Sequence, residues 1–126
     1  KTVVAINGDG GFQMTLPELG TILQSKVDIK IIILNNRFLG MVRQWQQLFF
    51  EKRYSFTEMI SPDFVALSKA YSIDAKKVEA REDLKTSLLE MLNHQGSYLL
   101  EVMVAKEENV FPMITTGASV SEIRLN

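Results

Sequence analysis

Two short segments carry residues whose types and spacing suit the binding of a phosphorylated ligand. The first is Gly8-Asp9-Gly10-Gly11, where glycines let a phosphate approach the backbone closely and leave N–H groups free to donate. The Asp9 carboxylate would repel a bare diphosphate, and a divalent cation bound between the two removes that repulsion. This segment therefore predicts a metal together with the phosphate, although by itself it is equally consistent with a simple turn.

The second segment begins at Asn35-Asn36 and runs to Gly40. Side-chain amide oxygens and backbone carbonyls are hard, neutral ligands that suit Mg²⁺ when phosphates supply much of the negative charge. A carboxylate, an amide, a carbonyl, phosphate oxygens and water together complete an octahedron, and the sequence offers the first three. The presence of both segments favours a metal-diphosphate site over a simple turn.

The elements that position these segments are predicted to alternate between strand and helix. Apolar or β-branched runs predict strands at 3–6, 29–34, 73–78 and 98–104. Apolar residues at helical spacing predict helices at 16–24, at 82–92 and beginning near 39 and 61. Thr15 and Glu18 form the predicted capping box of the first helix, and Ser61 is the predicted N-cap of the third. This order predicts an α/β fold with an open, mainly parallel sheet flanked by helices.

In such a sheet, ligands bind beyond the carboxyl ends of the strands. Both candidate segments follow a predicted strand, so we expect them to lie at the same edge of the sheet. We expect residues 1–105 to form one α/β domain and residues 106–126, which lack clear periodicity, to form a C-terminal tail. Because the chain begins inside a predicted strand, we expect the domain to be N-terminally truncated.

The composition bounds the kind of protein. The 126 residues are 46% hydrophobic and 23% charged, which is typical of one globular domain. The net charge of −1 comes from interleaved acidic and basic residues without a basic stripe, so no nucleic-acid partner is expected. The absence of cysteine excludes disulfides and thiolate metal sites and is compatible with the cytoplasm. No apolar run approaches the roughly 20 residues of a membrane helix, so no membrane association is expected.

Several other residues have structural interpretations. Arg43, Lys52 and Arg53 are predicted to form a solvated face, and Glu101 to make a structural hydrogen bond on the last strand. Trp45, on an amphipathic helix, is by default a core residue. His94, the only histidine, is predicted to be a solvated residue at a helix C-terminus.

The pair Gly8-Asp9-Gly10 and Asn35-Asn36 resembles the motif that binds thiamine diphosphate. The similarity continues through the helix start Gly40-Met41-Val42-Arg43-Gln44-Trp45 and the ending Phe111-Pro112-Met113, which resemble the acetolactate synthase family of catalytic subunits. The first pair alone indicates only the superfamily, whereas the helix start and the ending point to this family. The resemblance covers nearly the whole chain and implies the diphosphate-binding domain of the thiamine-diphosphate-binding fold.

The resemblance also implies roles for individual residues. Mg²⁺ would be held by the side chains of Asp9 and Asn36 and the backbone carbonyl of Phe38. The cofactor would contact Gly8, Asp9, Gly10, Gly11, Asn36, Gly40 and Met41, and the substrate channel would be lined by Met41, Val42 and Trp45. No catalytic residue is assigned to this chain, because the family's activating glutamate comes from another domain of the neighbouring subunit. The isolated chain is therefore expected to be inactive.

For the whole protein, the resemblance implies a transferase that condenses pyruvate with a second 2-oxo acid, pyruvate or 2-oxobutyrate, and releases CO₂ in branched-chain amino-acid biosynthesis. The implied cofactors are thiamine diphosphate, Mg²⁺ and FAD, the last bound by a domain absent from this chain. The implied assembly is a cytoplasmic homodimer or tetramer with a possible regulatory small subunit. Two alternatives remain open: another thiamine-diphosphate oxo-acid decarboxylase or oxidase, and a non-catalytic, degenerate cofactor-binding module.

Overall fold

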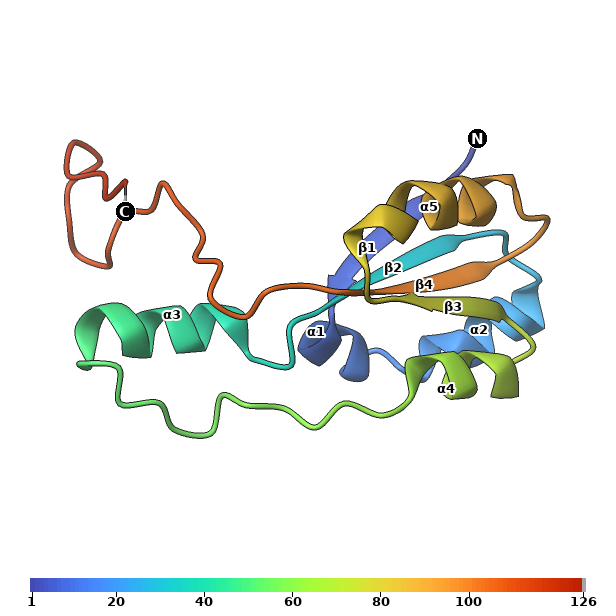
Figure 1. Ribbon diagram of the computed structural model, residues 1–126, viewed down its shortest axis with the longest axis horizontal. Helices are drawn as coiled ribbons and strands as arrows, with labels where there is room; N and C mark the ends of the chain where they lie inside the picture. Colours follow the sequence, from blue (N-terminus) through green and yellow to red (C-terminus); the bar gives the residue numbers. More distant parts are fainter. Residues whose placement is uncertain (126) are drawn as a thin grey trace.

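Four strands form one sheet in which all neighbours run parallel (Figure 1). The computed structural model describes residues 1–125. The strands are β1 (Val4–Gly8), β2 (Lys30–Asn35), β3 (Asp74–Val78) and β4 (Tyr98–Met103), and their spatial order is β1-β2-β4-β3. This confirms the predicted parallel α/β sheet, and all four predicted strands are present within one or two residues of their expected bounds.

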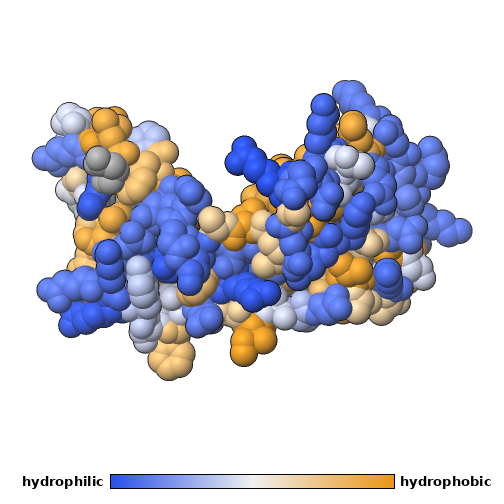
Figure 2. Space-filling view, viewed as in Figure 1, coloured by the Kyte–Doolittle hydropathy of each residue, from blue (hydrophilic) through white to orange (hydrophobic). Residues whose placement is uncertain are grey.

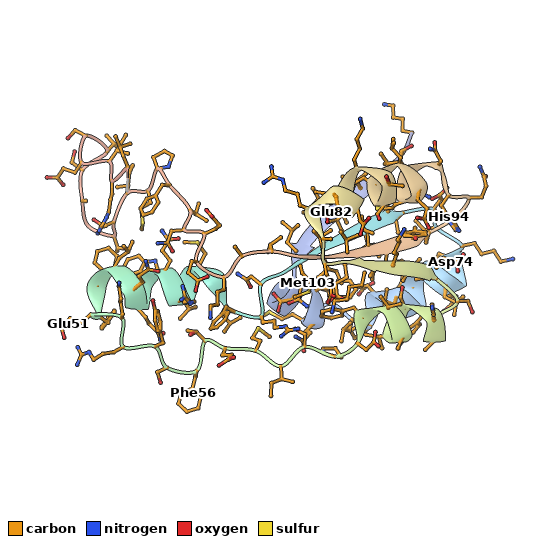
Figure 3. All side chains as sticks on the ribbon, viewed as in Figure 1. Glu51, Phe56, Asp74, Glu82, His94 and Met103 are labelled. Atoms are coloured by element: carbon orange, nitrogen blue, oxygen red, sulfur yellow. The ribbon has the colours of Figure 1, made fainter. Side chains whose placement is uncertain are left out.

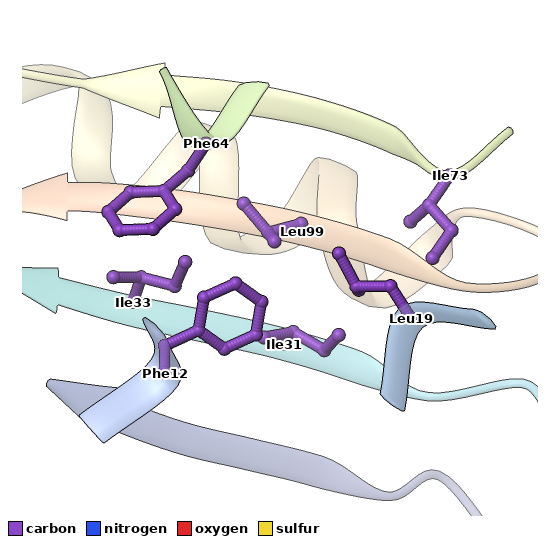
Figure 4. Packing of buried hydrophobic residues seen from close by; sticks show 7 residues of the cluster. All are labelled: Phe12, Leu19, Ile31, Ile33, Phe64, Ile73 and Leu99. Carbon is purple, nitrogen blue, oxygen red and sulfur yellow. The ribbon is translucent and has the colours of Figure 1, made fainter. Parts of the chain in front are cut away.

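Helices cover both faces of the sheet (Figure 1). On one face lie α1 (Asp9–Gln13), α2 (Glu18–Ser25) and α4 (Phe64–Ala70), and on the other lies α5 (Leu84–Asn93), preceded by the 3₁₀ turn η1 (Arg81–Asp83). The core beneath the first three helices is shown in Figure 4 and consists of Phe12, Leu19, Ile31, Ile33, Phe64, Ile73 and Leu99. A second cluster beneath α5 consists of Val78, Met91, Tyr98, Leu100 and Val102.

The central strands β2 and β4 are buried on both faces because helices cover each side. Lys30 is the exception to the apolar pattern of β2. Its side chain is 3% exposed, and its ammonium group donates to Asp28 and to the backbone carbonyls of His94 and Gly96. These partners satisfy a charge that would otherwise be costly to bury.

The helix α3 (Gly40–Phe49) lies away from the sheet, and residues 104–125 run back beside it (Figure 1). The surface is hollowed between this end of the molecule and the sheet (Figure 2). The buried residues of α3 are Arg43 and Gln44, which contact the tail, and not its apolar side chains. The prediction of a solvated Arg43 is therefore wrong, because the tail covers the polar side of the helix.

Three helix starts differ from what the sequence suggested. A short helix begins at Asp9, where no helix was predicted. The Thr15 hydroxyl donates back to the Phe12 carbonyl, and α2 begins only at Glu18, so the predicted capping box is absent. The N-cap of α4 is Asp63, whose carboxylate accepts from the Ala66 N–H at 2.8 Å, and Ser61 has a different partner.

The division into a domain at 1–105 and a tail at 106–126 stays a prediction, and Asn126 lies outside the described residues. After β4 ends at Met103, the described part of the tail contains one isolated antiparallel bridge, between Met113 and Arg124. Within residues 1–125, no helix has the length and hydrophobicity needed to cross a membrane.

Candidate functional site

The first candidate segment lies where β1 ends and α1 begins. Gly8 is extended, Asp9 opens the helix, and Asp9 is 1% exposed. Its Oδ2 atom accepts a hydrogen bond from the Ser61 hydroxyl at 3.0 Å. Its Oδ1 atom makes no hydrogen bond to another residue of the described chain, 1–125. A buried carboxylate that has one oxygen without a hydrogen bond is suited to bind a cation.

The second candidate segment follows β2 and is shaped by two consecutive asparagine side chains. Asn35 Oδ1 accepts from the Arg37 N–H at 3.0 Å, and Asn36 Oδ1 accepts from the Phe38 N–H at 2.9 Å. Such Asx turns reverse the chain without helical hydrogen bonds, and they hold Arg37 at a φ of 60°. Asn35 Nδ2 also donates to Glu101 Oε1 at 2.7 Å, which is the structural hydrogen bond expected of Glu101.

The backbone of Phe38 is oriented by segment 57–59. An antiparallel bridge pairs Phe38 with Glu58, and it is flanked by hydrogen bonds of 2.8 Å from Leu39 N to Thr57 O and from Met59 N to Arg37 O. In this pattern the central pair is not hydrogen bonded, so the Phe38 N–H and C=O point away from segment 57–59. The Asn36 side chain accepts a hydrogen bond from the Phe38 N–H, and the Phe38 C=O is left available to a ligand on the side away from segment 57–59.

The parallel register brings the two segments together. Gly8 pairs with Leu34 at the ends of β1 and β2, so Asp9 and Asn36 emerge at the same edge. They share a pocket of about 530 Å³, a size common for small-molecule sites. This pocket is lined by every residue predicted to bind the cofactor or the metal, and by Val42: Gly8, Asp9, Gly10, Gly11, Asn36, Phe38, Gly40, Met41 and Val42.

Trp45 is the one predicted site residue that the structure places elsewhere. It lines a neighbouring pocket of about 540 Å³ that shares only Val42 with the first. Its ring packs against Phe49 at a centroid distance of 4.9 Å, and its side chain is partly buried. The structure therefore brings Met41 and Val42 to the candidate site, with Trp45 one helical turn farther along α3.

The glycines of the first segment differ in how much space surrounds the position that a Cβ would occupy. A Cβ at Gly10 would lie 2.8 Å from Met59 Sδ and 2.9 Å from Leu39 Cδ2, so any side chain there would have to displace these two side chains. Gly8 and Gly11 have no neighbouring atom within 4 Å of an added Cβ and border open space in the pocket. Of the three glycines, these two therefore leave room in the pocket for a ligand.

The donor set of the pocket fits Mg²⁺ bound together with phosphates. Within residues 1–125 no group of three His, Cys, Asp or Glu side chains converges, so a cation held by protein carboxylates alone is not supported. Asp9, the Asn36 amide and the Phe38 carbonyl supply one charged and two neutral oxygen donors. This number of ligands leaves positions that phosphate oxygens and water would fill. The only histidine, His94, lies at the opposite end of the sheet beside Asp74 (Figure 3).

A second, more polar pocket of about 400 Å³ adjoins the first and contains the buried Glu101 together with Arg37 and Lys77. Lys77 donates to Glu79 at 2.7 Å, and this hydrogen bond raises the pKa of Lys77, with a smaller rise from the Glu101 charge. Lys77 therefore remains cationic near Glu101. Ser61, which lines this second pocket, donates to Asp9, which lines the first.

Sequence reasoning missed three contributors to the site. Ser61 contacts Asp9, Asn35 braces the turn through Glu101, and Glu108 of the tail lines the pocket. The role of Asn35 could have been recognised, because two adjacent asparagines can each form an Asx turn. The contacts of Ser61 and Glu108 join residues far apart in sequence, and no local pattern indicates them.

The fold and the site together define a class of protein. Residues 1–102 match the family described as "Thiamine pyrophosphate enzyme, C-terminal TPP binding domain", and the chain belongs to this family. Its sequence is 46% identical to that of the acetolactate synthase isozyme 2 large subunit of Escherichia coli (strain K12), over 97% of this chain and 22% of that protein. It is also 46% identical to the mitochondrial acetolactate synthase of Schizosaccharomyces pombe, over 98% of this chain and 18% of that protein. The chain thus spans about a fifth of the length of these relatives.

Solved structures give the same class. Benzoylformate decarboxylase from Polynucleobacter necessarius superposes with a TM-score of 0.78 at 30% identity, over 88% of this chain and 21% of that one. The thiamine diphosphate-dependent 4-hydroxybenzoylformate decarboxylase of Rhodococcus jostii RHA1 gives 0.76 at 27% identity, over 83% of this chain and 20% of that one. The predicted thiamine-diphosphate-binding fold and the predicted family are confirmed.

Proposed function

We propose that this chain is the cofactor-anchoring part of an acetolactate synthase that condenses pyruvate with a second 2-oxo acid. One observation carries the proposal. The predicted cofactor and metal residues line a single pocket, in a chain that is 46% identical to acetolactate synthases over nearly its whole length. Anchoring is a large part of catalysis when a cofactor must meet its substrate at a fixed angle.

In this proposal Asp9, Asn36 and the Phe38 carbonyl hold Mg²⁺ against the diphosphate of the cofactor. Thiamine diphosphate, when bound, supplies the carbanion chemistry of the reaction. The exposed side chains of Met41 and Val42 form an apolar wall beside the pocket, and they limit the access of water to it. Trp45, on the same helix, contributes to the choice of the second 2-oxo acid from its neighbouring pocket.

The proposal for the whole protein includes elements that lie beyond this chain. FAD is bound by another domain, and a glutamate of a neighbouring subunit activates the cofactor, so the working unit is at least a homodimer, with a possible regulatory small subunit. The isolated chain is inactive. The absence of cysteine is compatible with the proposed cytoplasmic location. The proposed pathway is branched-chain amino-acid biosynthesis.

Product analysis of the full-length protein tests the activity. With pyruvate, thiamine diphosphate, Mg²⁺ and FAD, we expect acetolactate. Acetaldehyde or acetate would instead favour a sister decarboxylase or oxidase, a candidate that the two similar decarboxylase structures support. The absence of turnover would favour a non-catalytic cofactor-binding module.

Substitution of Asp9 tests the metal site. Asp9→Ala in the full-length protein should abolish Mg²⁺-dependent retention of thiamine diphosphate, because it removes the only charged ligand proposed for the cation. Trp45→Leu is the matched control on the neighbouring pocket: it should leave cofactor retention intact and change the ratio of products formed from competing 2-oxo acids. Unchanged cofactor affinity in Asp9→Ala would refute the metal assignment.

A further inference from the structure

Segment 57–61, which precedes α4, contacts both halves of the candidate metal site. We propose that this segment is a strap that holds the metal-binding groups in position, and that Ser61 is a positioning residue that fixes the Asp9 carboxylate. The inference rests on the metal site of the proposed function and assigns to it a residue that does not touch the metal.

The contact between Ser61 and Asp9 sets the orientation of the carboxylate. The Ser61 hydroxyl donates to Asp9 Oδ2 at 3.0 Å, across 52 positions of sequence. This hydrogen bond occupies one carboxylate oxygen and leaves Oδ1 for the cation. Because Asp9 is 1% exposed, its carboxylate depends mainly on neighbouring protein groups for its orientation. Partners of this kind orient metal ligands and raise metal affinity.

The other end of the strap sets the position of the Phe38 carbonyl. The hydrogen bonds that Leu39 and Met59 donate, each of 2.8 Å, pair the strap with the chain on either side of Phe38. Thr57, whose carbonyl accepts the first of them, is 2% exposed. This pairing directs the Phe38 carbonyl away from the strap, toward the pocket that Asp9 also lines.

Met59, in the middle of the strap, closes the distance between the two loops. Its side chain packs directly on Gly10, where an added Cβ would lie 2.8 Å from Met59 Sδ. The strap therefore touches the residue after Asp9 and the residues around Phe38 within five positions. Its contacts add to the direct packing of Leu39, from the second loop, on Gly10 of the first.

A purely structural role for Ser61 in capping α4 is excluded by the helix itself. Asp63 is the N-cap, and its carboxylate accepts from the Ala66 N–H at 2.8 Å. The Ser61 hydroxyl has Asp9 as its hydrogen-bond acceptor and is thus committed to the metal site.

The test measures how much Mg²⁺ the full-length protein needs to bind thiamine diphosphate, by calorimetric titration of the cofactor at a series of Mg²⁺ concentrations. Ser61→Ala should raise the half-saturating Mg²⁺ concentration by about 10- to 100-fold, the range typical for loss of a partner of a metal ligand. Ser61→Thr, which keeps the hydroxyl, should stay close to the wild-type value. Ser25→Ala, at an exposed position of α2, is the control for serine removal elsewhere.

A second pair of variants separates positioning from folding. Ser61→Thr and Ser61→Val have nearly the same shape and differ in the hydroxyl, so their ratio of half-saturating Mg²⁺ concentrations reports that group even if Ser61→Ala lowers the thermal stability of the metal-free protein. A ratio of about 10 or more supports the strap. Equal values for Thr and Val, or an unchanged value for Ser61→Ala, would overturn it.

Asp9→Ala, measured in the same titration, distinguishes failure of this inference from failure of the proposed function. Loss of Mg²⁺ dependence in Asp9→Ala with no effect of Ser61→Ala leaves the metal site standing and overturns only the strap. An unchanged Mg²⁺ requirement in Asp9→Ala removes the metal site, and the strap with it.

Discussion

Different interactions hold the two ends of this molecule. The sheet region, residues 4–36 and 64–103, is organised around two apolar clusters beneath helices on both faces. The α3 region, residues 37–63 and 104–125, has no such cluster among the described residues, and its buried side chains on α3 are Arg43 and Gln44. Large apolar residues there face outward, including Phe56, which is 100% exposed, and Ile60, which is 98% exposed.

The two regions contribute different residues to the pocket. Asp9 belongs to the sheet region and lies beside the apolar core beneath α1, α2 and α4. Met41, Val42 and Glu108 belong to the α3 region, where polar contacts to the tail can open separately. Of the proposed metal ligands, Asp9 and Asn36 therefore lie on the side of the pocket with the apolar core, whereas Phe38 lies in the α3 region and depends on its pairing with the strap. The wall formed by α3 and the tail is the side of the pocket that we expect to open more readily.

The largest expected effect comes from removing a core ring of the sheet region. Phe64 is 0% exposed and packs edge-on against Phe12 at a centroid distance of 5.6 Å. Phe64→Ala should lower the free energy of unfolding by about 3–5 kcal/mol, because it removes buried apolar surface and leaves a cavity. Urea denaturation of this chain measures it. Phe56→Ala, the matched control in the α3 region, should change the same quantity by less than about 0.5 kcal/mol.

Breaking the contact between α3 and the tail should have a smaller and local effect. Gln44 donates to the Val110 carbonyl at 3.0 Å and accepts from the Val110 N–H at 2.8 Å. Gln44→Ala removes both hydrogen bonds, worth about 2 kcal/mol together, and should raise the population of undocked tail by about 30-fold. Hydrogen exchange at Val110 measures this opening.

The control for this contact is Gln24→Ala, at an exposed position of α2. It should leave exchange at Val110 unchanged. If Gln44→Ala destabilised the sheet region as much as the tail, the two regions would form one cooperative unit, and the comparison would fail.

A conservative change at Arg43 sharpens the comparison further. Its guanidinium stacks over the rings of Phe38 at 5.1 Å and Tyr54 at 4.5 Å, and it lies 3.6 Å from the Glu107 carboxylate. Arg43→Lys keeps the charge but loses the guanidinium that reaches both the Lys106 carbonyl, at 3.3 Å, and the Glu107 carboxylate of the tail, so it should weaken tail docking by about 1 kcal/mol. Limited proteolysis of the tail measures the difference, and Arg53→Lys, at an exposed arginine, is the control.

The smallest effect is a pH dependence confined to the sheet region. The hydrogen bond from Lys76 at 2.7 Å, and then that from Tyr98 at 3.1 Å, lower the pKa of Glu90 below its ordinary value of 4.5. A lowered pKa in the folded state gives stability that is fully present above pH 4.5 and is lost as the pH falls through the lowered value. Glu90→Gln should therefore have a lower Tm than the wild type at neutral pH.

The difference in Tm between Glu90→Gln and the wild type should shrink as the pH falls from about 6 to about 3. Thermal melts at a series of pH values measure it. A difference that stays constant across this range would mean that Glu90 titrates with its ordinary pKa in the folded protein.

Most of the sheet region was predictable because its patterns are local. Runs such as Ile31–Ile33 specify buried strands, and the rule that ligands bind beyond the carboxyl ends of parallel strands places Asp9 and Asn36 at one edge. The helix at Asp9 was not predicted, since Gly10 and Gly11 disfavour helix formation intrinsically. Packing of Phe12 against Phe64 overrides that preference.

The α3 region was less predictable because its structure depends on partners far away in sequence. The spacing of Met41, Val42 and Trp45 correctly indicates a helix, but it does not reveal that the tail covers Arg43 and Gln44, which lie 63 and 66 positions from their partners. Ser61 was misjudged for the same reason. A serine before a proline resembles a cap, and only the folded chain brings it to Asp9.

The outer strand of the sheet has a practical consequence for handling the protein. Within residues 1–125, β1 pairs only with β2, so its other edge offers unpaired backbone groups, and Val4 and Ile6 beside it are 40% and 64% exposed. An open, apolar strand edge is a template on which further strands can assemble. Purified by itself at high concentration, this chain should tend to form β-rich aggregates that grow from β1.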